Sequence, residues 1–256
     1  QFWPEAVKHN ATMFTYVGEL CRFLLSCDPH PLEREHKIKW IMGNGLRPEV
    51  WPEFIKRFNI HHVIEFYGAT EGNVSLINVD GPIGAVGRVP NYLKFKFNID
   101  IVQYNVEDNT NPRGADGFCV RTRPDEIGEM IGEIRNDDPR FRFEGYETKE
   151  ATNKKILRNV FKKGDAWFRT GDLMKRDALG YYYFMDRVGD TFRWKAENVA
   201  TGEVAAVLSK FDGVTQANVY GVDVPGYDGR AGIETVAVAA RPRAHPAARR
   251  SPPGTW

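Results

Sequence analysis

Hydrophobic positions in the first third of the chain follow two different periods. Residues 12–17, 39–42 and 62–67 have the short apolar pattern of buried strands. The stretch between the last two has the period of an amphipathic helix, with an apolar face at Trp51, Phe54, Ile55 and Phe58. Residues 19–26 predict another helix. A strand–helix–strand series of this length indicates a βαβ unit in a largely parallel sheet.

The helical period is lost between Val74 and Glu144. Short strand-like segments there alternate with turns rich in Asp, Asn, Gly and Pro, which predicts a β-rich subdomain. A charged helix is expected over residues 149–163, followed by short strands at 167–168 and 181–184.

The pattern changes again after Asp190. We expect a helix whose apolar face is Val204, Val207, Leu208 and Phe211, followed by strands at 217–222 and 234–238. This segment predicts the beginning of a second small domain. Residues 241–256 hold four Arg, no acid and no apolar periodicity, which is typical of a disordered tail or an aberrant gene product.

The start of the chain gives no targeting signal. Position 1 is Gln, and residues 2–7 already have the pattern of packed structure, so we expect the chain to begin inside a longer protein. No apolar run approaches the roughly 20 residues that span a bilayer.

Composition and charge narrow the function classes. The 256 residues are 42% apolar and 27% charged, which is typical of a globular protein. Lys plus Arg (35) nearly equals Asp plus Glu (34), so charge gives no reason to expect a nucleic-acid partner. Three cysteines without a CxxC pair favour a reducing compartment. His61 and His62 point to opposite faces of a strand, which favours structural roles over a shared metal ion.

One candidate site follows the strand at 62–67. The segment Tyr67-Gly68-Ala69-Thr70-Glu71-Gly72-Asn73 places a hydroxyl and a carboxylate where a buried strand leaves the sheet. In open α/β sheets ligands bind at this edge, and these groups suit phosphate oxygens and a divalent cation. A Gly-rich turn with an incidental acid is the alternative.

Two further motifs lie in the second half. In Thr170-Gly171-Asp172, the glycine lets backbone approach a ligand and the carboxylate suits two ribose hydroxyls, although an Asp that completes a tight turn is the alternative. The segment Asp186–Val199 joins two differently patterned regions, where Gly189 could absorb a hinge motion. A charged surface hairpin is the alternative there.

The order and spacing of these motifs resemble those of the acyl-adenylate-forming, or AMP-binding, superfamily. Four segments make the resemblance closer, to the fatty acid transport protein and very long-chain acyl-CoA synthetase family: Tyr16–Leu20, Gly43–Pro48, Glu65–Asn73 and Asp186–Val199. The resemblance covers about residues 2 to 232.

The resemblance implies an α/β fold of the adenylate-forming kind, with mixed sheets and helices, a β-rich subdomain and the start of a small α+β C-terminal domain. On this basis residues 1–186 are the later part of the large AMP-binding domain and residues 187–240 an incomplete small domain. Residues 241–256 are the tail.

The resemblance also implies a role for each matching residue. Thr70 and Glu71 would be catalytic, with Thr70 on phosphate and Glu71 holding Mg²⁺. Asp172 would bind the ribose hydroxyls, Arg187 would reach the nucleotide, and Gly189 with Asp190 would form the hinge. The remaining nucleotide-binding residues would be Gly43, Asn44 and Gly45 on the adenine and acyl side, Tyr67 stacked on adenine, Gly68 and Ala69.

The implied function is ATP-dependent activation of a long or very long-chain fatty acid to acyl-CoA through acyl-AMP, using Mg²⁺ and CoA and linked to fatty acid uptake. A transporter or binding protein without ligase activity, and a pseudoenzyme or truncated gene product, are the alternatives. The family's phosphate-loop Lys would precede residue 1 and its C-terminal Lys would follow Val238, so we expect the isolated chain to be inactive.

The parent protein is expected on the cytosolic face of a membrane, at the endoplasmic reticulum, peroxisome, lipid droplet or plasma membrane. Membrane association would come through segments outside this chain, and homodimerisation is left open.

Overall fold

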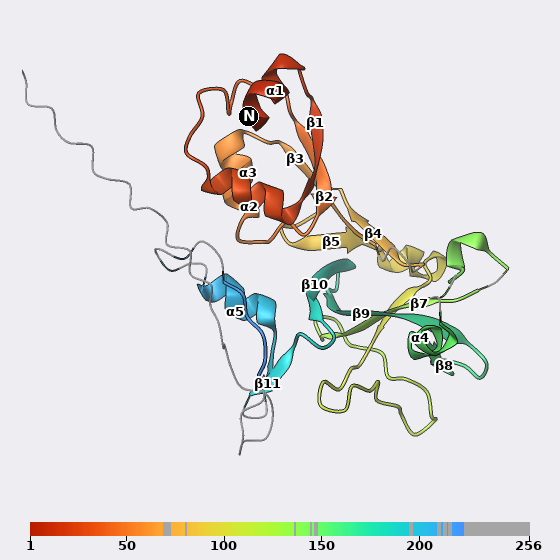
Figure 1. The fold of residues 1–256 in the computed structure, drawn as a ribbon. Helices are drawn as coiled ribbons and strands as arrows, with labels where there is room; N and C mark the ends of the chain where they lie inside the picture. The colour runs from red at the N-terminus through yellow and green to blue at the C-terminus, as the bar shows by residue number, and fades with distance from the viewer. Residues whose placement is uncertain are drawn as a thin grey trace, which may run out of the picture.

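The computed structural model of the chain describes residues 1–68, 73–79, 81–135, 137–143, 145, 148–194, 197–208, 211, 214 and 217–222. Figure 1 shows three groups of elements along the chain: a helix-covered sheet at the N-terminal end, a β-rich middle, and a short hairpin with a helix. Among the described residues, no helix is long and apolar enough to cross a membrane.

The first sheet has the strand order β1-β2-β3-β4, with the first three strands parallel and β4 antiparallel to β3. Its strands are β1 (Met13–Val17), β2 (Trp40–Asn44), β3 (His62–Gly68) and β4 (Ser75–Asn78). The helices of this layer are α1 (Phe2–Lys8), α2 (Gly18–Ser26) and α3 (Trp51–Phe58). The βαβ prediction is therefore confirmed.

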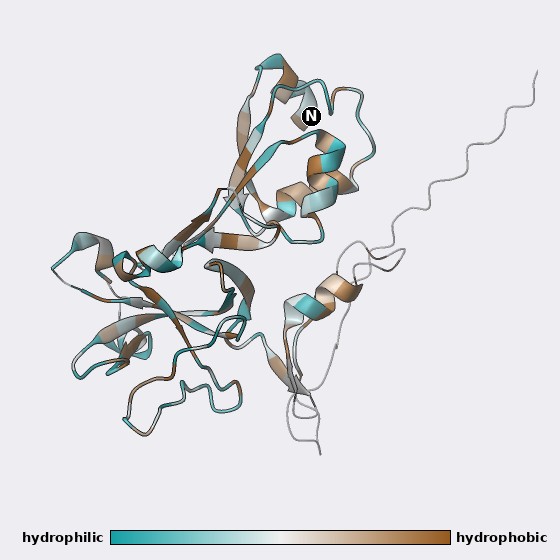
Figure 2. Ribbon diagram, turned by 180° about the vertical axis from the view of Figure 1, so that it is seen from behind, coloured by the Kyte–Doolittle hydropathy of each residue, from teal (hydrophilic) through white to brown (hydrophobic). Residues whose placement is uncertain are grey.

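One face of this sheet forms a core with the three helices. Phe54 and Phe58 of α3 are fully buried there against Trp3 and Ile41, as the helical period predicts. Asn59, at φ 53°, ends α3 in the left-handed conformation. Figure 2 shows hydrophobic residues along the strands and on the helices of this layer.

The β-rich middle is an antiparallel sheet with the strand order β5-β10-β9-β7-β6, and β8 also pairs with β9. The strands are β5 (Ala85–Arg88), β6 (Ile99–Val102), β7 (Gly128–Glu133), β8 (Ile156–Arg158), β9 (Ala166–Arg176) and β10 (Tyr181–Arg187). The short helices are η1 (Asn91–Lys96), η2 (Pro139–Phe141) and α4 (Lys149–Lys154). Its core includes Met130, Phe168, Met174 and Tyr182, and the predicted β-rich subdomain is confirmed.

The charged helix expected over residues 149–163 is wrong for its second half, because α4 ends at Lys154. The next residues form β8 and pair with β9 in a hairpin, and this pairing overrides the local helical spacing. The chain then turns around the Asp165 carboxylate, which accepts the N–H groups of Val160 at 2.6 Å and Phe161 at 3.0 Å. The strand expected at 167–168 also runs further, to Arg176.

The C-terminal elements are a hairpin of β11 (Phe192–Trp194) and β12 (Glu197–Val199) and the helix α5 (Thr201–Leu208). The apolar face expected for this helix is wrong in part. Val207 and Phe211 are 56% and 62% exposed, whereas Ala205 is buried. Residues 217–222 are described without strand structure, and residues 234–238 and the tail 241–256 lie outside the described residues.

Candidate active site

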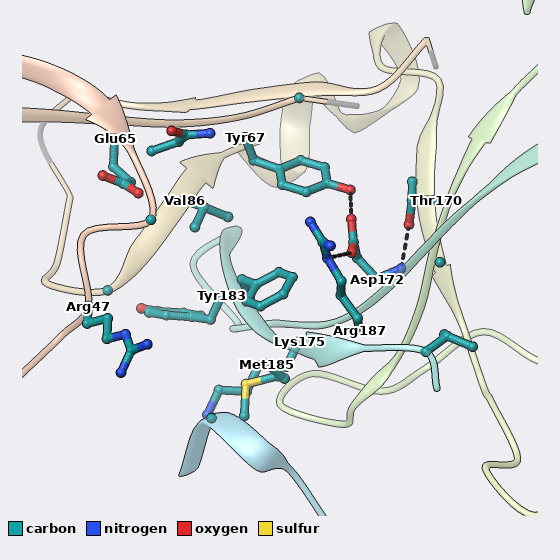
Figure 3. A pocket seen from close by; sticks show the side chains of 18 of the residues that line it. Arg47, Glu65, Tyr67, Val86, Thr170, Asp172, Lys175, Tyr183, Met185 and Arg187 are labelled. Atoms are coloured by element: carbon teal, nitrogen blue, oxygen red, sulfur yellow. Dashed lines mark hydrogen bonds and ion pairs between the residues drawn. The ribbon is translucent and has the colours of Figure 1, made fainter. Parts of the chain in front are cut away.

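A cavity of about 1110 Å³ lies where the carboxyl ends of the parallel strands meet the β-rich sheet. The loop after β2, the end of β3, strands β9 and β10 and helices α4 and α5 all contribute to its lining. This edge of a parallel sheet is the usual place for a ligand in an open α/β fold. Figure 3 shows the side chains that converge there.

Three residues from distant segments meet in the cavity. The Tyr67 hydroxyl donates a hydrogen bond to the Asp172 carboxylate, and Arg187 Nε lies 3.8 Å from Asp172 Oδ1 (Figure 3). Burial raises the pKa of Asp172, and the Tyr67 hydrogen bond and the Arg187 charge oppose that rise. Burial and the Asp172 charge raise the pKa of Tyr67. The tyrosine therefore remains a neutral donor beside an acidic acceptor.

A break in strand regularity directs Asp172 into the cavity. Gly171 has φ +78° within β9, a backbone conformation that side-chain-bearing residues rarely adopt. The Asp172 N–H donates to Thr170 Oγ1 at 3.1 Å, and the Thr170 hydroxyl donates to the Met130 carbonyl at 2.8 Å. The Gly171 carbonyl accepts the Val188 N–H at 2.8 Å. These contacts fix the backbone at Asp172. The segment Thr170-Gly171-Asp172 lies inside β9, so the alternative of a tight turn is wrong.

A second carboxylate in the lining, Glu65, is buried at 2% exposure. Tyr16, Gly43 and Glu65 occupy one row across β1, β2 and β3. Because Gly43 has no side chain, the Tyr16 ring passes over it and its hydroxyl donates to Glu65. The Leu46 N–H donates to Glu65 Oε1 at 3.2 Å, which ties the loop after β2 to the sheet.

Burial raises the pKa of Glu65 to about 7, although the hydrogen bonds from Tyr16, Leu46 and Gly45 favour its charged form. Burial and the Glu65 charge raise the pKa of Tyr16. No cation is recorded against this carboxylate among the described residues. With a pKa of about 7, Glu65 can exchange a proton near neutral pH.

Another carboxylate of the lining, Glu129 on β7, has a cationic partner. Arg169 donates to it in a two-pronged contact, with Nη2 2.9 Å from Oε2 and Nε 3.1 Å from both oxygens. Asn111 Nδ2 donates to the same carboxylate at 3.0 Å. Glu129 is 1% exposed, so this pair is a buried one that supports the cavity wall.

The predicted hinge follows β10. Gly189 has φ +100° and open space where a side chain would stand, and the Asp190 N–H donates to the Arg187 carbonyl at 3.1 Å. The buried Asp186 carboxylate accepts the Thr191 hydroxyl at 3.0 Å and the Thr201 N–H at 2.8 Å. Asp186 thus ties the end of β10 to the start of α5.

The structure brings most of the predicted nucleotide residues together. The cavity is lined by Asn44, Gly45, Tyr67, Gly68, Asp172 and Arg187. Gly43 is not part of this lining, since it lies beneath the Tyr16 ring. Ala69, Thr70 and Glu71 lie outside the described residues, and so does their predicted contact with phosphate and Mg²⁺.

Sequence reasoning missed Glu65, Glu129 and Arg169 as site residues. Glu65 carried a usable signal, since a carboxylate at the centre of an apolar strand requires buried partners. In the described part of the chain no three His, Cys, Asp or Glu side chains gather as a metal site would require. His62 stacks on Trp40 with ring centroids 3.9 Å apart, in keeping with a structural role.

The arrangement can hold a nucleoside. A carboxylate with free lone pairs accepts two vicinal hydroxyls, an aromatic ring covers a base, and a guanidinium adds positive charge for phosphate. All three groups are present within one cavity that also has apolar lining from Val86, Phe168 and Met185.

The sequence is similar to long-chain fatty acid transport proteins. It is 47% identical over 238 residues to long-chain fatty acid transport protein 1 of Mus musculus, which covers 93% of the chain and 37% of that protein. It is 48% identical over 237 residues to long-chain fatty acid transport protein 2 of Rattus norvegicus, which covers 92% of the chain and 38% of that protein. The chain thus spans less than half the length of these relatives. No protein-family model matches it.

Solved CoA ligases share the fold. A benzoate CoA ligase from Burkholderia xenovorans LB400 superposes with a TM-score of 0.62 at 22% identity, covering 88% of the chain and 40% of the ligase. ATP-bound MatB from Rhodopseudomonas palustris superposes with a TM-score of 0.65 at 22% identity, covering 88% of the chain and 41% of MatB. The mixed α/β architecture is therefore that of the adenylate-forming CoA ligases.

Proposed function

The chain belongs to the long-chain fatty acid transport protein family, and from this premise we propose that its protein activates long or very long-chain fatty acids to acyl-CoA through an acyl-AMP intermediate. The observation that carries the proposal is the meeting of Tyr67, Asp172 and Arg187 in one cavity at the carboxyl edge of the parallel sheet. These are the groups that a bound adenosine requires, and they come from three separate segments.

In the first step the fatty carboxylate attacks the α-phosphorus of ATP, forming acyl-AMP and releasing pyrophosphate. The Tyr67 ring covers the adenine, Asp172 accepts the ribose hydroxyls and Arg187 supports the nucleotide. Thr70 would contact phosphate oxygens, and Glu71 would hold Mg²⁺, which would supply charge stabilisation on the phosphates.

In the second step the CoA thiol attacks the acyl carbonyl, forming the thioester and releasing AMP. The segment after Arg187 turns about Gly189 and Asp190. The side of this segment that faces the cavity during adenylation moves away, and another side faces the cavity during thioester formation. Asp186 lies on β10 before the hinge, and its hydrogen bonds to Thr191 and Thr201 join it to the segment that turns.

The proposal extends to partners and place. ATP, Mg²⁺ and CoA are the co-reactants, and a long or very long-chain fatty acid is the substrate. The protein works at the cytosolic face of a membrane, which is where a fatty acid that crosses the bilayer becomes available for trapping as its CoA ester.

Nucleotide binding to the chain tests the proposal directly. Isothermal titration should detect AMP, and Asp172→Ala should weaken that binding about tenfold or more, since a hydrogen bond to a charged group contributes about 1.5–3 kcal/mol. Asp116→Ala, on an exposed loop away from the cavity, is the matched control. Equal AMP binding by both variants would contradict the proposed site.

A segment exchange tests the reaction. The matching part of the mouse relative is replaced by residues 1–238 of this chain, and acyl-CoA formation from a long-chain fatty acid is measured. We expect formation that depends on ATP and that Asp172→Ala removes. A well-folded exchange protein without that reaction would overturn the ligase proposal.

Fatty acid transport without ligation is the second candidate, because the relatives are named as transport proteins. Uptake measured in cells with the Glu71→Ala form of the same exchange protein separates the two. Uptake that persists when acyl-CoA formation is lost would favour an independent transport function. Uptake that falls together with ligation would favour trapping as the CoA ester.

A further inference from the structure

Lys155 occupies a position beside Asp172 that the family motifs do not include. It follows the last residue of α4, and its carbonyl accepts the Arg169 N–H at 2.8 Å, two residues before Gly171. The next residue, Ile156, pairs with Phe168 on β9. The backbone of Lys155 is therefore fixed against the strand that carries Asp172.

The side chain of Lys155 crosses Gly171. Its ammonium nitrogen lies 3.1 Å from the point that a Cβ on Gly171 would occupy. The absence of a side chain at Gly171 therefore makes the room through which this ammonium reaches the cavity. Lys154 and Lys155 both belong to the cavity lining.

Among the described residues, no salt bridge neutralises the positive charge of Lys155. In the part of the chain that the structure describes, no carboxylate lies within 4.0 Å of its ammonium group. Asp172 instead has Arg187 as its ion-pair partner, at 3.8 Å. Lys155 acts on Asp172 from a greater distance, by its charge alone. Lys155 as a whole is half-buried, and an ammonium group without a carboxylate partner can bind an anion that approaches Asp172.

We propose that Lys155, with Lys154 beside it, binds a phosphate ester carried by the adenosine whose ribose hydroxyls lie on Asp172. The inference rests on the proposed function, which places a ribose at Asp172. A phosphate on the 5′ or 3′ carbon of that ribose is held a few bonds from its hydroxyls, so a cation beside the carboxylate can reach it. The 5′-phosphate of AMP or ATP leaves both ribose hydroxyls free for Asp172, whereas the 3′-phosphate of CoA replaces one of them and leaves only the 2′-hydroxyl for that carboxylate.

Titrations with adenosine, AMP and CoA test the proposal on the chain itself. Lys155→Met should weaken AMP or CoA binding about tenfold, or about 1.4 kcal/mol, and change adenosine binding less than about twofold. Lys154→Met should have a smaller effect in the same direction. Lys149→Met is the matched control, since it removes an exposed lysine of the same helix that does not line the cavity.

The ligand that loses affinity identifies the source of the phosphate. A loss confined to AMP assigns the 5′-phosphate, and a loss confined to CoA assigns the 3′-phosphate. If Lys155→Met weakens adenosine as much as AMP and CoA, Lys155 merely stabilises Asp172 and the proposal is wrong. Unchanged AMP and CoA binding also overturns it.

Two further measurements keep the test decisive. If Lys155→Met does not fold, Lys155→Arg is used instead and should retain phosphate-dependent binding. In the unaltered chain, the higher affinity for AMP or CoA than for adenosine should shrink between low and high salt. An advantage that salt does not change would refute the proposal. If the unaltered chain binds neither adenosine, AMP nor CoA, the proposed function itself fails. If it binds all three equally, only the Lys155 inference fails.

Discussion

Glu65 and Glu129 are both buried in the wall of the same cavity, one in each sheet, and the two sheets stabilise them in opposite ways. Glu65 lies in the parallel sheet and is held by neutral donors, the Tyr16 hydroxyl and backbone N–H groups. Glu129 lies in the antiparallel sheet and is held by the two-pronged guanidinium of Arg169. The first can become neutral by taking a proton, whereas the second is balanced by an opposite charge.

The difference follows from what each sheet can place beside its carboxylate. The inner face of the parallel sheet is covered by three helices and offers hydrophobic side chains. Among the described residues, the Tyr16 hydroxyl and the loop after β2 are the groups that reach Glu65. In the β-rich sheet, β7 and β9 are neighbours, and a long cationic side chain on β9 reaches across to Glu129. Neutral donors make a carboxylate sensitive to pH, and a cationic partner makes the pair sensitive to loss of either member.

Removing the cation should have the largest effect on this contrast. Arg169→Met leaves Glu129 buried without its counter-charge, and we expect the free energy of unfolding to fall by about 3–5 kcal/mol. Urea denaturation measures it. Arg22→Met, which breaks a pair whose carboxylate on Glu19 is 56% exposed, should change stability by less than about 1 kcal/mol. Equal losses in the two variants would contradict the distinction drawn for Glu129.

Replacing Glu65 by a residue that does not titrate should have the next largest effect, which appears only in the pH dependence of the free energy of unfolding. The folded pKa of about 7 lies above the ordinary value of 4.5, so the folded state holds this proton more tightly. The stability contributed by Glu65 is therefore complete below about pH 4.5 and is lost as pH rises through 7.

Glu65→Gln should abolish that loss. Relative to the unaltered chain, its free energy of unfolding should rise by about 3 kcal/mol between pH 4.5 and pH 8. Urea denaturation at several pH values measures the difference. Glu133→Gln, a carboxylate near the surface at 24% side-chain exposure, serves as the comparison. Parallel pH profiles for Glu65→Gln and the unaltered chain would refute the shifted titration.

The smallest effect is expected at a third buried carboxylate, Asp186, which resembles Glu65 in having hydroxyl and N–H donors. The Thr201 hydroxyl donates to Asp186 Oδ1 at 3.1 Å. Thr201→Val removes this hydroxyl and keeps the N–H, so the free energy of unfolding should fall by about 1 kcal/mol. Thermal unfolding checks this, with Thr15→Val on an exposed strand position as the control. A loss of stability as large as that of Arg169→Met would show that Asp186 depends on its partner as strongly as Glu129 does.

Local pattern predicted the elements well where one period dominates. The α3 face, including Trp51, Phe54 and Phe58, is buried as its spacing indicates. The prediction failed at residues 155–163, because apolar residues at Ile156 and Leu157 suit a helix face and a strand equally. Pairing with β9, formed by residues about ten positions later, decided between them.

The sequence predicted which residues line the candidate site better than it predicted how they are arranged. The family resemblance that the motifs carry pointed to Tyr67, Asp172 and Arg187, which the structure gathers in one cavity. Gly43 was expected in the pocket, yet it serves as the gap through which Tyr16 reaches Glu65. No motif pointed to Lys155, since its relation to Asp172 arises from strand pairing and from the conformation of Gly171.

The amino-acid sequence by itself determined the alternation of helices and strands, the β-rich middle and the order of the nucleotide motifs, because each depends on residues that are close along the chain. Only the tertiary structure decided which buried carboxylate has which partner. Tyr16 and Glu65 are 49 positions apart, Glu129 and Arg169 are 40, and Tyr67 and Asp172 are 105. Such contacts depend on sheet order and register, and these are set by the packing of whole elements rather than by any local period.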